Sequence, residues 1–285
     1  MFFIIGIVIV FGSVAGGYAP HGDFRVLWQP FEFLIILGAA VGGFIISNPK
    51  EVIFATGKHF GRLLKSAPYN KQDYVDLLCL QFSLFKLAKS KGALALEAHI
   101  ENPEESTIFA NYPAFLKNRD GIDFLCDTLR LITMGTENPH ELEAMMDDDI
   151  ESRKHGPHAV AHAVTQMGDG LPAFGIVAAV LGVIVTMGSI SEPPEVLGYL
   201  IGAALVGTFF GIFIAYGVVG PIGTYLASFC EAEFKYLECM RSGILAYVQG
   251  YAPAISVEFA RKTLSGHDRP SFIELEDATS ELAPA

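Results

Sequence analysis

Four stretches of the chain contain no Asp, Glu, Lys or Arg and are long enough to cross a lipid bilayer. They are residues 2–20, 33–49, 170–191 and 196–230. A helix needs about 20 apolar residues to span a hydrocarbon core of roughly 30 Å, so each stretch predicts one transmembrane helix. The last stretch exceeds one span, and we expect its helix to leave the membrane near Pro221. The expected spans are residues 2–20, 31–48, 170–190 and 197–220.

The polar segments between and after these stretches also carry helical patterns. Apolar side chains recur at helical spacing over residues 73–91 and 120–134. A cap residue followed by Pro139 starts a further helix over residues 140–154, which we expect to end at the Gly-Pro pair after His155. The tail is expected to be helical from residue 231 to 250 and again after Pro253. Its last fifteen or so residues are acidic and are expected to fray.

No stretch alternates in the manner of a half-buried strand. The pattern therefore predicts an all-α integral membrane protein with four transmembrane helices, a helical cytoplasmic insert between helices two and three, and a helical cytoplasmic tail. The expected parts are a first transmembrane hairpin (1–48), a cytoplasmic helical domain (49–169), a second transmembrane hairpin (170–222) and a cytoplasmic helical tail (223–285).

Composition and the placement of basic residues support this reading. Hydrophobic residues make up 51% of the chain, and the mean hydropathy is +0.40, which is high for a water-soluble domain. Only Arg25 lies between the first two spans, and no basic residue lies between the last two. Basic residues gather after the second span, at Lys50, Lys58, Arg62 and Lys65. Because Lys and Arg are retained in the cytoplasm, both termini and the insert are predicted to be cytoplasmic.

The polar parts of the chain exclude several classes of function. A net charge of −12 argues against a nucleic-acid or anionic-lipid partner. Four isolated cysteines favour reduced core or interface positions over disulfides or metal ligands. His155, His158 and His162 flank the Gly-Pro pair, which predicts a solvated loop with no metal set. No catalytic or nucleotide-binding motif occurs, so neither an enzyme nor a cofactor is expected.

The four charge-free stretches contain no carboxylate, histidine or basic side chain, and none is expected inside the membrane. An ion carrier normally keeps such a group in the membrane, so this chain needs a partner to supply it. Hydroxyl side chains remain in the last two spans, and each can line a polar path or bond to its own helix backbone. They are Thr186, Ser189, Thr208, Tyr216 and Thr224.

Prolines and glycines in the spans leave two readings open. Pro172 either starts a helix or belongs to a movable junction, and Pro221 either marks the exit from the membrane or belongs to the same junction.

Glycines at four-residue spacing allow close helix packing, within the chain or between copies. The pairs are Gly12 with Gly16, Gly38 with Gly42, Gly198 with Gly202, and Gly207 with Gly211.

Four blocks together resemble the MotA family of flagellar stator subunits. They are "IENPEESTIFANYP" (100–113), "LPAFGIVAAVLGVIVTMGS" (171–189), "VGTFFGIFIAYGVVGP" (206–221), and "GYAPAISVEFARKTL" with "RPSFIELE" (250–276). The resemblance runs in order along nearly the whole chain. It implies an inner-membrane complex in which several copies surround a pair of MotB helices, and MotB supplies the ion-binding aspartate.

The resemblance also assigns roles to single residues. It implies that Pro172 and Pro221 act in torque generation. The expected ion path is lined by Ala179 and Thr208, on which the resemblance bears, and by the hydroxyl residues Thr186 and Tyr216. Sodium-type relatives tend to have Thr where this chain has Ala179, so protons are the favoured ion.

Charged residues of the insert are implied to contact the rotor protein FliG. Glu97 matches the acidic site of the family, and Lys89 stands where the best-known members have Arg, so the bidentate guanidinium is lost and Lys86 shares the role. The expected function is a proton-conducting stator subunit. The alternative is an energiser of outer-membrane processes of the ExbB or TolQ kind, which the four-span topology disfavours. A hypothesis of a different class is a passive scaffold that only organises a membrane complex, which predicts no ion flux with its partner.

Overall fold

The computed structural model describes residues 2–59, 61, 68–136 and 138–282. These residues form helices and turns, and no strand occurs among them, so the predicted all-α class is confirmed. Arg62 and Lys65, which supported the predicted orientation, lie outside the described residues. The chain divides into two compact units, one of residues 1–66 with 156–229 and the other of residues 67–155 with 230–285.

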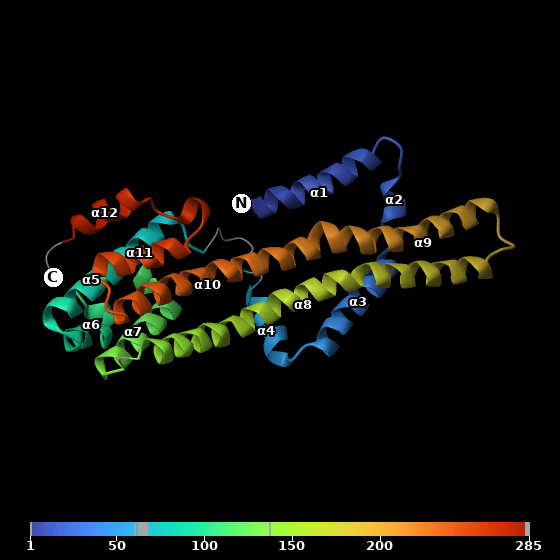
Figure 1. Cartoon of the computed structure of the whole chain (residues 1–285). Helices are drawn as coiled ribbons and strands as arrows, with labels where there is room; N and C mark the ends of the chain where they lie inside the picture. Colours follow the sequence, from blue (N-terminus) through green and yellow to red (C-terminus); the bar gives the residue numbers. More distant parts are fainter. Residues whose placement is uncertain (1, 60, 62–67, 137, 283–285) are drawn as a thin grey trace. The chain divides into compact units, whose positions relative to one another are not determined.

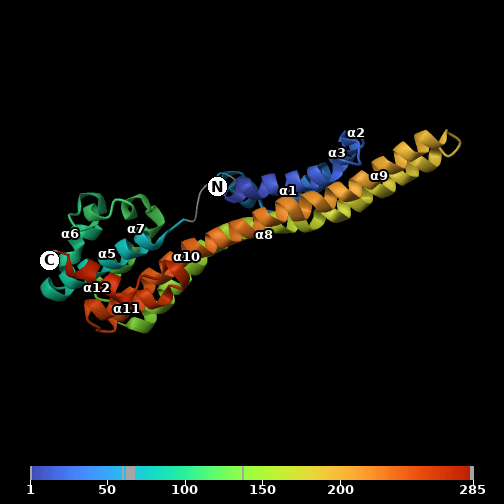
Figure 2. The same cartoon turned by 90° about the horizontal axis from the view of Figure 1, so that it is seen from above.

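The first unit contains the most apolar helices (Figures 1 and 2). They are α1 (Phe2–Tyr18), α2 (Phe24–Leu27), α3 (Pro30–Ser47), α4 (Lys50–His59), the C-terminal part of α8 (Pro139–Gly188), α9 (Pro194–Ile214), the π-helical turn η6 (Ala215–Val219) and the start of α10 (Gly220–Val248). Both views show α8 and α9 side by side, joined by the turn after Gly188. α3 packs against α9.

Three helical segments are long and apolar enough to cross a membrane among the described residues. They are Phe24–Ser47, Pro139–Gly188 and Pro194–Val248, whereas α1 is apolar but only 17 residues long. Their large apolar side chains are exposed, for example Ile176, Ile184 and Ile201. Such a surface is unfavourable in water and suits lipid or other helices. The chain is therefore built as a membrane protein.

The second unit has a conventional hydrophobic core. Its elements are α5 (Lys71–Lys91), η2 (Ala93–Leu96), α6 (Glu97–Ile100), η3 (Pro103–Glu105), η4 (Phe109–Asn111), η5 (Phe115–Lys117), α7 (Arg119–Thr133), the start of α8, the rest of α10, α11 (Pro253–Thr263), η7 (Gly266–Asp268) and α12 (Phe272–Ser280). Leu77, Leu80 and Leu84 of α5 are fully buried, as are Leu125 and Leu129 of α7. The helices predicted from this spacing are confirmed.

The predicted break after His155 is wrong, because α8 continues through Pro157 and Pro172 to Gly188. A proline inside a helix costs about 3 kcal/mol, which packing must offset. Val160 and Val164 follow Pro157 and are buried in a cluster with Ile222 of α10. The three histidines that were expected in a loop, His155, His158 and His162, therefore lie on α8.

The expected fraying of the last residues is also wrong for α12. Ser271 and Glu274 form a reciprocal capping box that satisfies the free N–H groups at its start. Leu275 is buried in the core of the second unit, and Lys71 of α5 forms a 2.6 Å salt bridge with Glu274. The Ser-x-x-Glu spacing was the local signal for this helix.

Candidate functional site

Glycines bring α8 and α9 into direct backbone contact. A Cβ atom at Gly211 would lie 2.8 Å from the carbonyl oxygen of Leu171 and 2.9 Å from Cα of Gly175. These distances are shorter than van der Waals contact, so only glycine fits. Packing within the chain is thus confirmed for Gly211. In contrast, a Cβ atom at Gly12 or Gly198 would meet nothing within 4 Å in the described part of the chain.

Two of the predicted path residues lie at this contact. A Cβ atom at Gly207 would lie 3.4 Å from the backbone nitrogen of Ala179, and one at Gly175 would lie 3.4 Å from Cα of Thr208. Ala179 and Thr208 are both half-buried. The structure therefore places these two residues where the two helices meet.

The other two predicted path residues differ in their surroundings. Thr186 is buried, and its hydroxyl donates a 2.9 Å hydrogen bond to the carbonyl of Gly182. A Cβ atom at Gly182 would touch Ala204 of α9. Thr186 therefore lies on α8 one turn beyond a point where α8 and α9 touch. Tyr216 lies in η6 with 68% of its surface exposed, outside that contact.

Pro172 and Pro221 lie beside helical turns that approach each other. Pro172 lies inside α8 and has no N–H, so the carbonyl of Gly168 loses its usual helical partner. Pro221 is the second residue of α10 and follows Gly220, whose N–H reaches back to the carbonyl of Ala215 in the π-helical pattern of η6. A Cβ atom at Gly168 would lie 3.3 Å from the nitrogen of Gly220. The two weakened turns therefore touch. Because Pro172 lies far inside α8, its interpretation as a first-turn proline is wrong.

A carboxylate lies in the same region, which corrects the prediction that the spans have no ionisable group. α3 begins at Pro30, so Glu32 is in its first turn and within the membrane-capable segment. A Cβ atom at Gly207 would lie 3.3 Å from its Oε2, and one at Gly182 would lie 3.6 Å from its Oε1. Our predicted outer loop ended at Glu32. The proline two residues earlier was the missed signal for the helix start.

The residues expected to contact a rotor lie in the second unit. Lys86 is half-buried on α5, with its ammonium group 5.8 Å from the ring centre of Phe82. Lys89 at the end of α5 and Glu97 at the start of α6 are exposed. Within the described residues, none of these three charged side chains takes part in a salt bridge. They are available to a partner of complementary charge.

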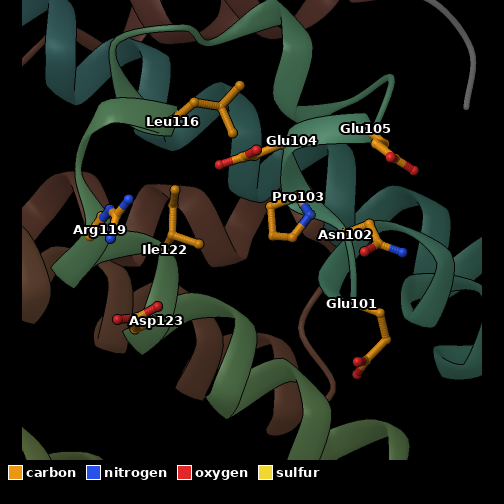
Figure 3. A pocket seen from close by; sticks show the side chains of 9 residues that line it. All are labelled: Glu101, Asn102, Pro103, Glu104, Glu105, Leu116, Arg119, Ile122 and Asp123. Atoms are coloured by element: carbon orange, nitrogen blue, oxygen red, sulfur yellow. The ribbon is translucent and has the colours of Figure 1, made fainter.

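A surface pocket of about 420 Å³ opens beside α7 (Figure 3). It is lined by Glu101, Asn102, Pro103, Glu104, Glu105, Leu116, Arg119, Ile122 and Asp123. Arg130 forms a 2.7 Å salt bridge with Glu101. The lining contains no nucleophile paired with a base. No group of three or more His, Cys, Asp or Glu side chains in the described residues is placed to hold a metal ion.

Comparisons with known proteins cover most of the chain. The family profile "Motility protein A N-terminal" matches residues 4–92, and "MotA/TolQ/ExbB proton channel family" matches residues 120–239. The chain is 44% identical to motility protein A of Escherichia coli (strain K12) over 278 residues, which are 97% of this chain and 94% of the relative. The chain belongs to the motility protein A family. The resemblance drawn from the four sequence blocks is confirmed.

Solved structures of stator complexes share the fold. "Structure of the flagellar MotAB stator complex from Bacillus subtilis" is 26% identical with a TM-score of 0.73, covering 90% of this chain and 92% of that chain. "Structure of C. jejuni MotAB" is 22% identical with a TM-score of 0.78, covering 94% of this chain and 98% of that chain. The second likeness supports the fold alone.

Proposed function

We propose that this chain is the ion-conducting stator subunit of a bacterial flagellar motor. Together with a MotB partner, it couples proton flow across the inner membrane to torque on the rotor. The observation that carries the proposal is the 44% identity to motility protein A over 97% of the chain. The ExbB/TolQ-like energiser is the weaker candidate, because the profile that matches residues 4–92 describes the N-terminal part of motility proteins.

We propose four spans with both termini and the insert in the cytoplasm. α1 supplies the short first span, α3 the second, and α8 and α9 the third and fourth. The rarity of basic residues in the two short loops, where only Arg25 occurs, supports this orientation. A reporter active only in the cytoplasm, fused to either terminus, should be active. An inactive fusion at one terminus contradicts the topology.

The proposed ion path runs along the contact between α8 and α9. Ala179 offers no hydroxyl oxygen to coordinate a metal cation there, which favours protons as the translocated ion. A proton needs only a titratable carrier, which the MotB aspartate provides. Several copies around a MotB pair would cover the exposed apolar faces, including Ile176 and Ile184.

The junction of Pro172 and Pro221 is proposed to pass each ion step to the rotor-binding part of the chain. One elementary charge crossing 100 mV supplies about 2.3 kcal/mol, which suffices only for a small packing change. Where two touching helical turns already have missing or altered backbone hydrogen bonds, a small change of helix geometry costs little free energy. Lys86, Lys89 and Glu97 are proposed to contact FliG.

The proline variants test the coupling role. Pro172→Ala or Pro221→Ala should leave the protein in the membrane with its partner and abolish swimming. Pro157→Ala is the matched control, because this proline is also inside α8 but lies before the junction. Swimming is measured in soft agar, and membrane levels by immunoblot. Normal swimming of the Pro172 and Pro221 variants refutes the role.

A charge reversal tests the rotor contact. Lys89→Glu should reduce swimming, and a compensating reversal on an acidic rotor residue should restore part of it. Lys117→Glu, at an exposed lysine of η5, is the control and should swim normally. Equal swimming of both variants contradicts the assignment of Lys89.

A further inference from the structure

We infer that Glu32 is a proton-binding residue of this chain, whose carboxylate takes up the translocated ion at the Pro30 end of α3. The inference rests on the proposed function and deepens it. The partner's aspartate is then not the only titratable group on the path, because this subunit contributes a carboxylate of its own.

The packing around Glu32 is built to admit a carboxylate between two helices. A Cβ atom at Gly207 would lie 3.3 Å from Oε2 of Glu32 and 3.1 Å from Cβ of Ala178. On the facing helix, a Cβ atom at Gly182 would lie 3.6 Å from Oε1 and 2.7 Å from Cβ of Ala204. The missing side chain of Gly207 therefore leaves room for the carboxylate, and Gly182 lets α9 approach closely beside it.

This position coincides with the proposed path. The space beside Gly207 is bounded by Glu32 Oε2 and also by the backbone nitrogen of Ala179, at 3.4 Å from the same Cβ position. On the other side, the hydroxyl of Thr186 bonds to the carbonyl of Gly182. Glu32 thus borders the residues that the sequence had already assigned to the ion.

Oε2 of Glu32 is buried and has no hydrogen-bond partner in the described part of the chain. Among the described residues, no salt bridge joins Glu32 to Arg25 of α2 or to any other side chain. An ionised carboxylate that is buried without a hydrogen bond or salt bridge costs free energy, and protonation removes this cost. A proton that arrives at Oε2 makes the neutral acid, and its departure to the next acceptor restores the carboxylate, with no other reactant consumed.

A purely structural role makes a different prediction. An acidic side chain in the first turn of a helix interacts favourably with the helix dipole by about 0.3–1 kcal/mol. Glutamine has nearly the same size and can form hydrogen bonds, but it takes up no proton. Glu32→Gln therefore separates proton binding from helix support, and Glu195→Gln, at the exposed acid in the first turn of α9, is the matched control.

The experiment measures proton flux in vesicles containing the chain co-purified with its MotB partner, driven by a potassium diffusion potential. Wild type and Glu195→Gln should conduct equally, and Glu32→Gln should fall to the level of empty vesicles. Flux through Glu32→Gln equal to wild type overturns the inference. Absence of flux in the wild type instead refutes the proposed function, so the two failures are distinguishable.

Chemical labelling of the wild-type complex gives an independent answer if Glu32→Gln does not assemble. Dicyclohexylcarbodiimide, an apolar reagent, adds to protonated carboxyl groups in apolar surroundings and leaves a stable N-acylurea. Mass spectrometry should find the adduct on Glu32 and not on the exposed Glu195. A complex labelled elsewhere but not at Glu32 overturns the inference.

Discussion

Replacing Gly211 by alanine puts one methyl group where α8 and α9 touch through their backbones. Its carbon would lie 2.9 Å from Cα of Gly175 and 2.8 Å from the carbonyl oxygen of Leu171. Carbon atoms pack best at about 3.5–4.0 Å, so the helices must separate by roughly 0.5–1 Å. Such a gap forfeits about a quarter to a half of the dispersion attraction across it, and overpacking costs typically about 1–3 kcal/mol.

Thermal unfolding of the complex in detergent, followed by circular dichroism, measures this cost. A shift of about 2–4 °C per kcal/mol holds for soluble domains of somewhat smaller size, so Gly211→Ala should melt several degrees below wild type. Proton flux should fall too, because Ala179 and Thr208 lie at the same contact.

Gly198→Ala is the control in the same helix, since its methyl group would meet nothing within 4 Å. It should melt at or slightly above the wild-type temperature, because alanine favours helix over glycine by about 1 kcal/mol. If both variants melt like wild type, the backbone contact does not hold the two helices together.

Three further predictions concern the second unit. Lys71 and the capping box lower the pKa of Glu274 to about 2, so the docking of α12 is stabilised above the ordinary pKa of 4.5 and loses this support as the pH falls toward 2. Hydrogen exchange of α12 should rise over that range, and Lys71→Met should reduce the step. Burial raises the pKa of the Cys239 thiol to about 12, so a maleimide should label it only after denaturation, and rapid labelling of the folded protein contradicts its burial. Arg261 is buried and donates a 2.8 Å hydrogen bond to the carbonyl of Pro270, so Arg261→Gln should lower the free energy of unfolding by about 1.5–3 kcal/mol in urea, and an unchanged midpoint excludes this role.

Local patterns along the chain predicted most of the helices. The apolar stretch that begins at residue 33 became α3, and the leucines at helical spacing became the buried face of α5. Such signals are strong because they repeat over many residues. The predicted burial of the four cysteines is likewise confirmed.

Two misses, the helix at Ser271 and the start of α3 at Pro30, had local signals in the sequence, whereas the others depend on packing between segments distant in sequence. Pro157 was expected to end a helix, but Val160 and Val164 pack on α10 and keep the helix continuous. The touching of Gly168 and Gly220 depends on two helices that meet only in the fold. The burial of Glu32 Oε2 needs three helices at once, and no window of one sequence contains that information.

The most direct test of the account is rotation of tethered cells that lack their own stator proteins and express this chain with its MotB partner. We predict rotation in sodium-free medium that stops when a protonophore collapses the proton gradient. Cells that do not rotate, or that rotate only with sodium and keep rotating with the protonophore, would contradict the claim that this chain couples proton flow to torque.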